Sequence, residues 1–426
     1  MNPKLAIHGG TAVRSIPLPP LLRGALVIGG EEKEEVDRVI DSKALFRYYG
    51  NDVQHCVERL EHQIAQEANV PYALGVTSGT AALIVALKAL GIGYGDKVIV
   101  PANTFTATAG AVICANAVPV YADIDESMNL DPHDLERVYD NEVKAIIAVP
   151  INGTPCDMDG IMAFAREKGI YVIEDVAQSL GTTYKGRFAG SIGHIGTFSF
   201  QMQKTITAGE GGAIITHDAG LFERAVRYHD QGSFREKMRY GFETGEQQAF
   251  AGQNYRMSEL TGAVLLAQWK KLDPIISVMR HRQQAARRAI EARLPQVRFR
   301  KSPDPAGDTG SVLGLFLPDA ETAVRFAQAV EAEGVTCFRM YGGRPIYMTP
   351  FLLHQRTAEK NNFPFDFPFR HPVAYKPGMC PVAEDLLSRY VHIPISPTLT
   401  ERDAEDIAEA VVKVYEGLGV DQWTKA

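Results

Sequence analysis

The sequence predicts an α/β protein in which a mainly parallel sheet is flanked by helices, followed by a smaller C-terminal α/β domain. Between residues 72 and 175, short apolar runs alternate with stretches of helical spacing, as in successive β-α-β units. The runs are continuously apolar, which is expected of strands that helices cover on both faces. The expected strands are YALGVT (72–77), DKVIVP (96–101), VPVYAD (118–123), VKAIIAVP (143–150) and GIYVIED (169–175), and the expected helices are 81–91, 107–117, 131–140 and 157–169.

Two segments precede this alternating region. Residues 1–30 are rich in Gly, Pro and Leu and are expected to form an extended arm. Residues 56–68 place four apolar side chains at helical spacing with charges between them, which predicts an amphipathic helix. Those apolar side chains are Val57, Leu60, Ile64 and Ala68.

The second half of the chain changes character. Two β-type runs flank TAGEGG (207–212), whose paired glycines suit a tight reversal, and 270–294 predict a long, arginine-rich helix with a solvated face. The stretch 355–380 is dense in prolines and aromatics and is expected to be an ordered loop, because proline breaks the helical hydrogen-bond ladder. We therefore expect an arm (1–30), a large domain (31–270) and a small domain (271–426).

Composition excludes several classes of function. The 426 residues carry a formal charge of −7, which argues against nucleic acid as a partner and gives no reason to expect an anionic membrane. No apolar run reaches the roughly 18 residues of a membrane span, and the N-terminus lacks the pattern of a signal peptide. The five cysteines are scattered and no pair has metal-ligand spacing, so we expect reduced thiols, a cytoplasmic location and no metal.

The motif VTSGTAAL suits a phosphate. A strand ends at Val76, and Ser78, Gly79 and Thr80 turn into a helix whose N-terminus offers free N–H groups and the positive end of the helix dipole. Glycine permits close approach of the backbone, and the hydroxyls add donors. A plain helix cap is the alternative interpretation.

Two ionisable residues follow at positions that suit ligand chemistry. Glu174 and Asp175 end an expected strand, and the carboxyl ends of parallel strands face the ligand crevice of open α/β sheets. Lys204, in FSFQMQK, is a lone lysine among apolar and neutral residues, and burial would lower its pKa and make the amine nucleophilic. A helix cap for Asp175 and a surface position for Lys204 are the alternatives.

A fourth motif, AGQNYRMSEL, places Asn254 and its neighbours before an apolar helix. Ser258 is expected to cap this helix, with Glu259 in its first turn. A loop that leads into a core helix is the alternative.

Together, and in this order, the motifs resemble the DegT/DnrJ/EryC1/StrS family of sugar and cyclitol aminotransferases. The resemblance runs from LAIHGGTAVR through TSGTAAL, EDVAQSLG, GTFSFQMQK, TAGEGG and GQNYRMSEL to CPVAEDLLSRYVHIPISP, and so covers nearly the whole chain. It implies the aspartate-aminotransferase-like fold, fold type I of the pyridoxal-5′-phosphate (PLP) enzymes. It also implies a homodimer with shared active sites.

The resemblance assigns roles to individual residues. Lys204 matches the lysine that carries the cofactor covalently and Asp175 the carboxylate at its pyridine nitrogen. Gln178 matches the side chain near the cofactor's phenolic oxygen, and Phe105 the aromatic residue that stacks on the ring. The phosphate contacts match Ser78, Gly79, Thr80, Ser199 and, across the dimer interface, Asn254. In these roles Asp175 keeps the ring protonated as an electron sink, and Lys204, once freed, moves the substrate proton.

The resemblance further implies that a keto-cyclitol or keto-sugar accepts the amino group of glutamine or glutamate. LAIHGGTAVR and TAGEGG look most like the branch that aminates scyllo-inosose-type cyclitols, and nucleotide-linked sugars are the main alternative acceptors. The segment 339–380 offers groups for a ring of hydroxyls, unless these side chains merely pack a loop: Arg339, Tyr341, Arg344, Tyr347, His354, Phe363, Phe365, Phe367, His371 and Tyr375. A PLP-dependent dehydratase or aromatase, or a regulatory protein on the same fold, is the alternative function, and the retained Lys204 argues against both the histidine-bearing dehydratases and a retired enzyme.

Overall fold

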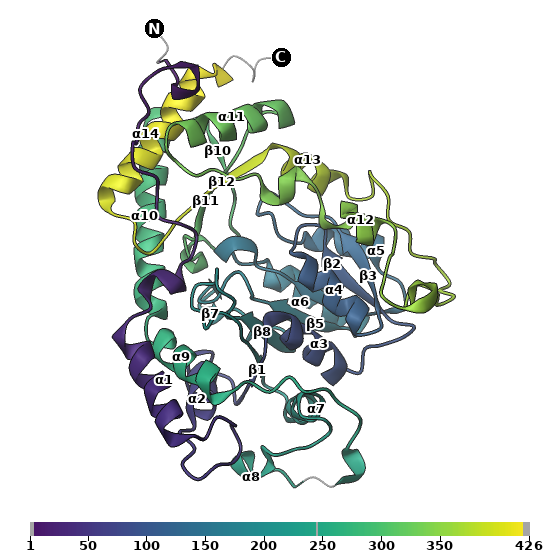
Figure 1. Cartoon of the computed structure of the whole chain (residues 1–426). Helices are drawn as coiled ribbons and strands as arrows, with labels where there is room; N and C mark the ends of the chain where they lie inside the picture. Colours follow the sequence, from purple (N-terminus) through teal and green to yellow (C-terminus); the bar gives the residue numbers. More distant parts are fainter. Residues whose placement is uncertain (1–3, 244–245, 421–426) are drawn as a thin grey trace.

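A computed structural model of the chain describes residues 4–243 and 246–420. Its centre is a seven-stranded sheet with the order β1-β9-β8-β5-β4-β2-β3, in which only β9 runs antiparallel to its neighbours (Figure 1). The sequence prediction of a mainly parallel sheet is confirmed. The strands are β1 (Tyr72–Val76), β2 (Lys97–Pro101), β3 (Val118–Ala122), β4 (Val143–Ala148), β5 (Tyr171–Asp175), β8 (Ile195–Ser199) and β9 (Gly212–Thr216).

Helices cover both faces of this sheet. Alternate residues of a strand enter different cores: Val98 and Val100 pack in the core that contains α3, whereas Ile99 packs in the core that contains α6. This explains why the strands are continuously apolar in sequence. The helices are α2 (Cys56–Glu67), α3 (Gly79–Ala89), α4 (Thr106–Cys114), α5 (Leu135–Val138), α6 (Met158–Lys168) and α7 (Ala219–His229). The helix α5 is shorter than the predicted 131–140, because the first turn of that segment is a 3-10 helix.

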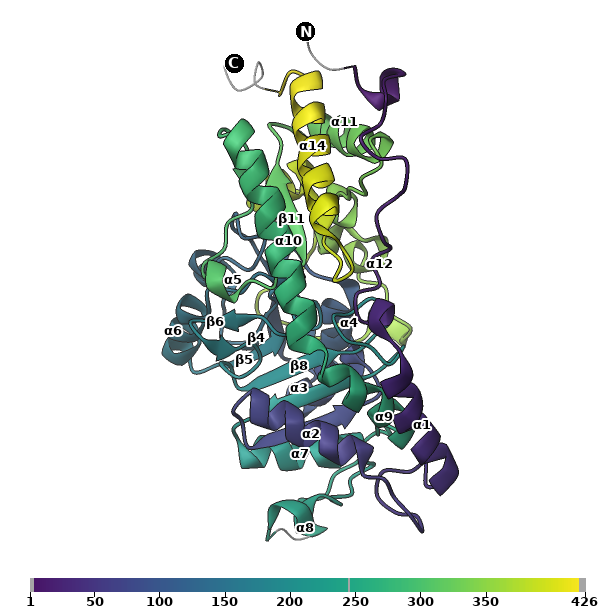
Figure 2. The same cartoon turned by 90° about the vertical axis from the view of Figure 1, so that its left-hand side faces the viewer.

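A second, three-stranded antiparallel sheet lies above the first in Figure 1, in the order β10-β11-β12. Its strands are β10 (Arg298–Phe299), β11 (Val312–Phe316) and β12 (Tyr390–Pro394), and its helices are α11 (Ala320–Ala332), α13 (Pro381–Arg389) and α14 (Glu401–Gly417). The long helix α10 (Leu272–Arg293) packs beside α14 and runs along the molecule from one sheet toward the other (Figure 2). One apolar core contains residues of both sheets. The domain boundary near residue 271 therefore stays a prediction.

The N-terminal arm runs beside α14 and ends at α1 (Gly30–Ser42), as Figure 2 shows. From residue 4 onward, where the structure describes it, the arm is extended except for two 3-10 turns, Ala6–His8 and Gly24–Val27. Arg14 fixes its upper part through ion pairs of 2.7 Å with both Asp403 and Asp406. Lower down, the Gly24 N–H donates to the Lys204 carbonyl at 3.1 Å, so the arm reaches the segment that contains the candidate catalytic lysine.

The predicted cap of the helix after AGQNYRM is present. The Thr261 N–H donates to Ser258 Oγ at 3.2 Å, and α9 (Glu259–Trp269) follows. The remaining elements are short: β6 (Thr183–Tyr184), β7 (Arg187–Phe188), α8 (Lys237–Tyr240) and α12 (Pro350–Leu353). None of the helices in the described ranges is long and apolar enough to cross a membrane.

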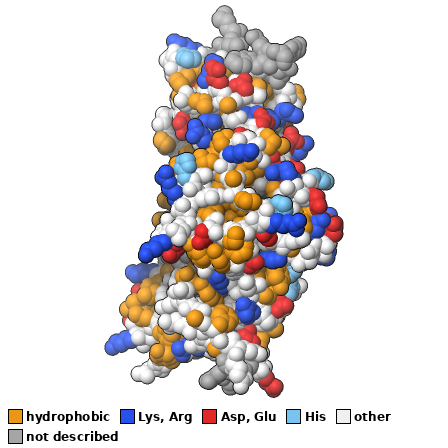
Figure 3. All heavy atoms as spheres, turned by 90° about the vertical axis from the view of Figure 1, so that its right-hand side faces the viewer, with side chains coloured by type: hydrophobic (Ala, Val, Ile, Leu, Met, Phe, Trp, Pro, Cys, Tyr) orange, Lys and Arg blue, Asp and Glu red, His pale blue; other side chains and the backbone are white. Residues whose placement is uncertain are grey.

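The segment 355–380 is irregular, as predicted, with one 3-10 turn at Lys360–Asn362. Its aromatic side chains pack on the body of the protein: Phe363 stacks on Tyr94 with ring centroids 4.9 Å apart, and Phe367 meets the same ring edge-on. Tyr94 precedes β2, so this contact lies at the amino end of the parallel strands. Figure 3 views the molecule from the side of this segment and shows apolar side chains gathered near the middle of the face.

Candidate active site

The carboxyl ends of the parallel strands bring the predicted phosphate residues together. The Ala81 N–H donates to Ser78 Oγ at 3.1 Å, so Ser78 caps α3. A Cβ on Gly79 would lie 2.6 Å from the Ser199 Cβ, and one on Gly212 would collide with the Ser78 carbonyl. Glycines therefore let the start of α3, the end of β8 and the start of β9 approach closely, and Thr80 follows in the first turn of α3.

Asp175 lies at the end of β5 with 4 % of its surface exposed. Its Oδ2 accepts a hydrogen bond of 2.8 Å from Thr108 Oγ1, and its Oδ1 accepts one of 3.2 Å from the Ala177 N–H. Burial raises the pKa of Asp175 above its usual value, while these bonds and the nearby Lys204 charge oppose the rise. The carboxylate thus lies in a site where an additional cation would stabilise it.

Glu174, predicted beside Asp175 as a candidate, has a structural role. Its carboxylate accepts hydrogen bonds of 2.8, 2.7 and 2.6 Å from the backbone N–H groups of Gly190, Ile192 and Gly193. Successive residues of a strand point to opposite faces, so only one of the two carboxylates faces the site.

Lys204 lies in the connection between β8 and β9. Its N–H donates to the Gln201 carbonyl at 2.9 Å, and the flanking backbone pairs across the connection through Phe200 and Gly211. Burial lowers the pKa of Lys204 below its usual value, the Asp175 charge opposes this, and the positive charge of Arg23 adds to it. A partly buried amine with a lowered pKa suits a nucleophile and a base. The paired glycines of TAGEGG lie where β9 begins, not at the tip of the reversal as the sequence suggested.

Gln178 contacts the C-terminal part of the chain. Its Nε2 donates a hydrogen bond of 3.1 Å to the Tyr341 hydroxyl. Burial raises the pKa of Tyr341 to about 12, so the hydroxyl is protonated at neutral pH and can itself donate. Tyr341 has φ of 48°, in the left-handed region that non-glycine residues rarely adopt, and its turn continues through Gly342 and Gly343, which also have positive φ.

The two remaining predicted residues are exposed. Phe105 precedes α4 with 54 % of its surface exposed, so its ring is free to stack on a ligand. Asn254 is also exposed, and its Oδ1 accepts a bond of 3.3 Å from the Arg256 N–H. Within the single chain, no hydrogen bond among the described residues joins Asn254 to Ser78, Gly79 or Ser199.

Two neighbours of the site were not predicted from the sequence. Thr108 bonds Asp175, and its position one helical turn after Phe105 is the signal that would have found it. Arg23 lies 6 % exposed on the N-terminal arm and influences the pKa of Lys204. A single arginine in an irregular arm carries no pattern, so no sequence signal pointed to it.

Of the side chains in 339–380 expected to bind substrate hydroxyls, Tyr341 is the one that the described contacts bring to the predicted site. Tyr375 donates from its hydroxyl to the Pro119 carbonyl at 2.5 Å, and Tyr347 donates to Glu384. The His371 carbonyl accepts from Lys97 Nζ at 2.9 Å. The expectation of a hydroxyl-binding surface along this segment is therefore wrong for Tyr347, Phe363, Phe367 and Tyr375, because their side chains pack against other parts of the fold, whereas the His371 side chain is exposed and its role stays a prediction.

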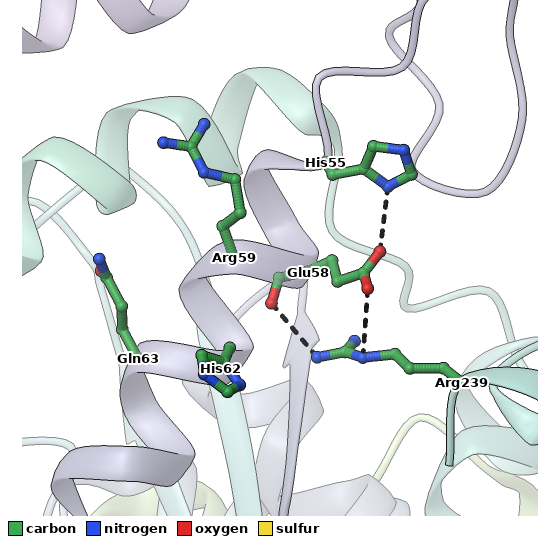
Figure 4. A pocket seen from close by; sticks show the side chains of 6 residues that line it. All are labelled: His55, Glu58, Arg59, His62, Gln63 and Arg239. Atoms are coloured by element: carbon green, nitrogen blue, oxygen red, sulfur yellow. Dashed lines mark hydrogen bonds and ion pairs between the residues drawn. The ribbon is translucent and has the colours of Figure 1, made fainter. Parts of the chain in front are cut away.

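An open depression of about 510 Å³ lies away from the predicted site residues, between α2 and α8. Figure 4 shows Glu58 there between His55 and Arg239. The Glu58 carboxylate accepts a hydrogen bond of 3.0 Å from His55 Nδ1, and its backbone carbonyl accepts one of 3.2 Å from Arg239 Nη2. This depression is lined by solvated ion pairs, and it lacks a partly buried amine and a buried carboxylate such as Lys204 and Asp175 of the predicted site. In the described ranges, no group of three or more His, Cys, Asp or Glu side chains could hold a metal ion.

Comparisons with known proteins point to one family. The model of the DegT/DnrJ/EryC1/StrS aminotransferase family matches residues 27–412. The chain is 31% identical to GDP-perosamine synthase of Escherichia coli O157:H7 over 387 residues, which is 91% of this chain and 96% of that protein. It is 32% identical to L-glutamine:2-deoxy-scyllo-inosose aminotransferase of Streptoalloteichus tenebrarius over 428 residues, 96% and 97% of the two chains. The crystal structure of 3-amino-5-hydroxybenzoic acid synthase superposes with a TM-score of 0.79 at 25% identity, covering 94% of this chain and 99% of that one.

Proposed function

The chain belongs to the DegT/DnrJ/EryC1/StrS aminotransferase family, and on that premise we propose that it transfers the amino group of glutamine or glutamate to a keto-cyclitol or keto-sugar. It is a PLP-dependent aminotransferase of fold type I. The observation that carries the proposal is that the buried Asp175 and the partly buried Lys204, at the carboxyl edge of the sheet, lie close enough for the charge of each to shift the pKa of the other.

The residues at this edge fit PLP. Gly79 and Gly212 leave room beside Ser78 and Ser199 that a Cβ would fill, and the free N–H groups at the start of α3 suit a phosphate. Asp175 is a buried carboxylate whose raised pKa indicates too little cationic compensation within the chain, and a protonated pyridine would supply it. When bound, PLP supplies an electron sink for the carbon that loses a proton.

Each side chain then has a distinct task. Asp175, held by Thr108, keeps a proton on the ring nitrogen. Lys204 Nζ, with its lowered pKa, removes the proton from the donor Cα. Phe105 is free to cover one ring face, and Gln178 positions the Tyr341 hydroxyl.

Two observations support a polyhydroxylated acceptor. The protonated Tyr341 hydroxyl lies at the site and can donate to a substrate oxygen. The relatives of similar identity act, by their names, on a cyclitol and in the synthesis of a nucleotide-linked amino sugar. We favour the cyclitol, because the opening LAIHGGTAVR and TAGEGG look most like that branch. Dehydration finds less support, since the chain retains Lys204 where the dehydratases carry a histidine. Aromatisation keeps the lysine, and it finds less support because the relatives include named aminotransferases.

The experiment supplies scyllo-inosose and a nucleotide-linked 4-keto-sugar separately, with glutamine as donor, and follows the aminated product by mass spectrometry. We expect amination of the cyclitol. Turnover with the nucleotide-linked sugar alone would overturn the cyclitol preference. A water-loss product without incorporated nitrogen would overturn transamination itself.

A further inference from the structure

Arg23 is a buried cation without a carboxylate partner among the described residues. Its side chain is 6 % exposed, and Nη2 donates to the Ser311 carbonyl at 3.1 Å. Its Nε has no hydrogen-bond partner in the described part of the protein. Burial alone lowers the pKa of Arg23 to about 10, so it stays charged at neutral pH.

Another arginine is equally buried but has carboxylate partners. Arg47 is also 6 % exposed, but its Nη2 forms ion pairs of 2.6 and 2.9 Å with Glu61 and Glu236. A buried charge is normally paired, because desolvation without compensation is strongly unfavourable. The guanidinium of Arg23, with one hydrogen bond to a carbonyl and no carboxylate among the described residues, therefore has the capacity to bind an anionic ligand.

The surroundings of Arg23 place that anion beside the reacting groups. Gly24, the next residue, donates its N–H to the Lys204 carbonyl, and the Arg23 charge lowers the pKa of Lys204. Arg23 also contacts the small sheet: Ser311, just before β11, accepts its hydrogen bond, and His392 of β12 lies close enough to feel its charge. His392 Nδ1 lacks a partner among the described residues. Burial, together with Arg300 and Arg23, lowers the pKa of His392 to about 3, so this ring is neutral and Arg23 supplies the charge.

We propose that Arg23 binds the α-carboxylate of the amino donor, an assignment that rests on the proposed function. The α-carboxylate is attached to the carbon from which Lys204 takes a proton, so it must lie close to that amine. The predicted phosphate contacts, in contrast, lie at Ser78, Gly79 and Ser199. A diphosphate on a keto-sugar would also be several bonds from the reacting carbonyl. The planar guanidinium, with Nε free, matches a carboxylate.

The test measures carboxylate binding separately from turnover. Glutaramate is glutamine without its α-amino group and cannot transaminate, and glutaramide is its uncharged counterpart. Calorimetric titration of the holoenzyme should show binding of glutaramate and much weaker binding of glutaramide. Arg23→Met should weaken glutaramate binding by about 10- to 100-fold, as expected for a lost charge-assisted hydrogen bond, and Arg23→Lys should restore part of it.

Kinetics supply the second readout. Arg23→Met should raise the KM for glutamine, leave the KM for the keto acceptor within about twofold, and abolish the preference for glutamine over 4-aminobutanamide, which lacks the carboxylate. Arg14→Gln is the matched control, because it loosens the same arm through Asp403 and Asp406 without touching the site. It should leave glutaramate binding unchanged.

The possible failures are distinguishable. Equal glutaramate affinity in the wild type and Arg23→Met, or a raised KM for the acceptor alone, would overturn the Arg23 assignment. So would an equal loss of binding in Arg14→Gln, because the effect would then come from seating of the arm. Arg23-dependent glutaramate binding in a protein that transaminates no donor would leave the anion site standing and overturn the proposed function.

Discussion

Gln178 Nε2 donates a hydrogen bond of 3.1 Å to the Tyr341 hydroxyl, which joins the segment after β5 to a turn 163 residues further along the chain. The pair connects the edge of the large sheet with the part of the chain that follows the small sheet's β11. It is also the one described hydrogen bond between a residue predicted to lie at the cofactor and a residue predicted to bind substrate.

Tyr341→Phe should lower kcat/KM for a hydroxylated acceptor by about 5- to 100-fold, because the variant removes a buried donor and leaves the Gln178 amide without its partner. The rate of the half-reaction with glutamine, followed by absorbance, should change little. Tyr375→Phe is the control, since its hydroxyl bonds the Pro119 carbonyl outside the site. An equal effect of both variants on the acceptor would contradict the role of Tyr341.

Asp175→Asn should weaken cofactor binding at least tenfold and yet stabilise the cofactor-free fold at neutral pH. The folded-state pKa of Asp175 is raised, so the stability that the group contributes is present below its unfolded pKa and is lost as pH rises through the folded pKa. The difference in unfolding free energy between the variant and the wild type should be near zero in acid. It should grow as the pH rises from the unfolded-state pKa of Asp175 to its folded-state pKa. Urea unfolding at several pH values measures it, and a variant less stable than wild type at neutral pH would contradict the sign.

Gly79→Ala should destabilise the protein by about 1–3 kcal/mol and weaken cofactor binding, because its Cβ would lie 2.6 Å from the Ser199 Cβ. Gly110→Ala is the matched control within α4, where an added Cβ meets no atom within 4 Å. Helix propensity should make that variant about 0.5–1 kcal/mol more stable. Thermal unfolding and PLP titration of both variants provide the measurement, and equal behaviour of the two would show that the close approach has no such role.

We predict a homodimer whose active sites use both chains. Asn254 is exposed, it does not contact the phosphate residues of its own chain through any described hydrogen bond, and it matches the cross-subunit phosphate ligand of the family. When Lys204→Ala and Asn254→Ala chains are mixed, each heterodimer has one intact and one doubly altered site. With random exchange, about a quarter of the wild-type sites should return. No gain over either parent after verified exchange would argue against shared sites.

Local patterns predicted much of this structure. The strands from 72 to 175 were visible because both faces are buried, and the Ser258 cap was visible because its chemistry is local. Long-range packing decided what was missed. Nothing local shows that Phe363 and Phe367 pack on Tyr94 rather than at the site. Likewise, only the folded arm reveals that Arg23 meets the Lys204 segment.

The identity of the reactive lysine is the central claim, and reductive labelling tests it most directly. The purified protein is reduced with borohydride, which fixes the pyridoxyl group on the amine that carries it, and is then digested and mapped by mass spectrometry. Lys204→Ala, reduced in parallel, is the control and should retain no label. We predict a single pyridoxyl modification on Lys204; a modification on any other lysine, or none in a protein that retains PLP, would contradict the account.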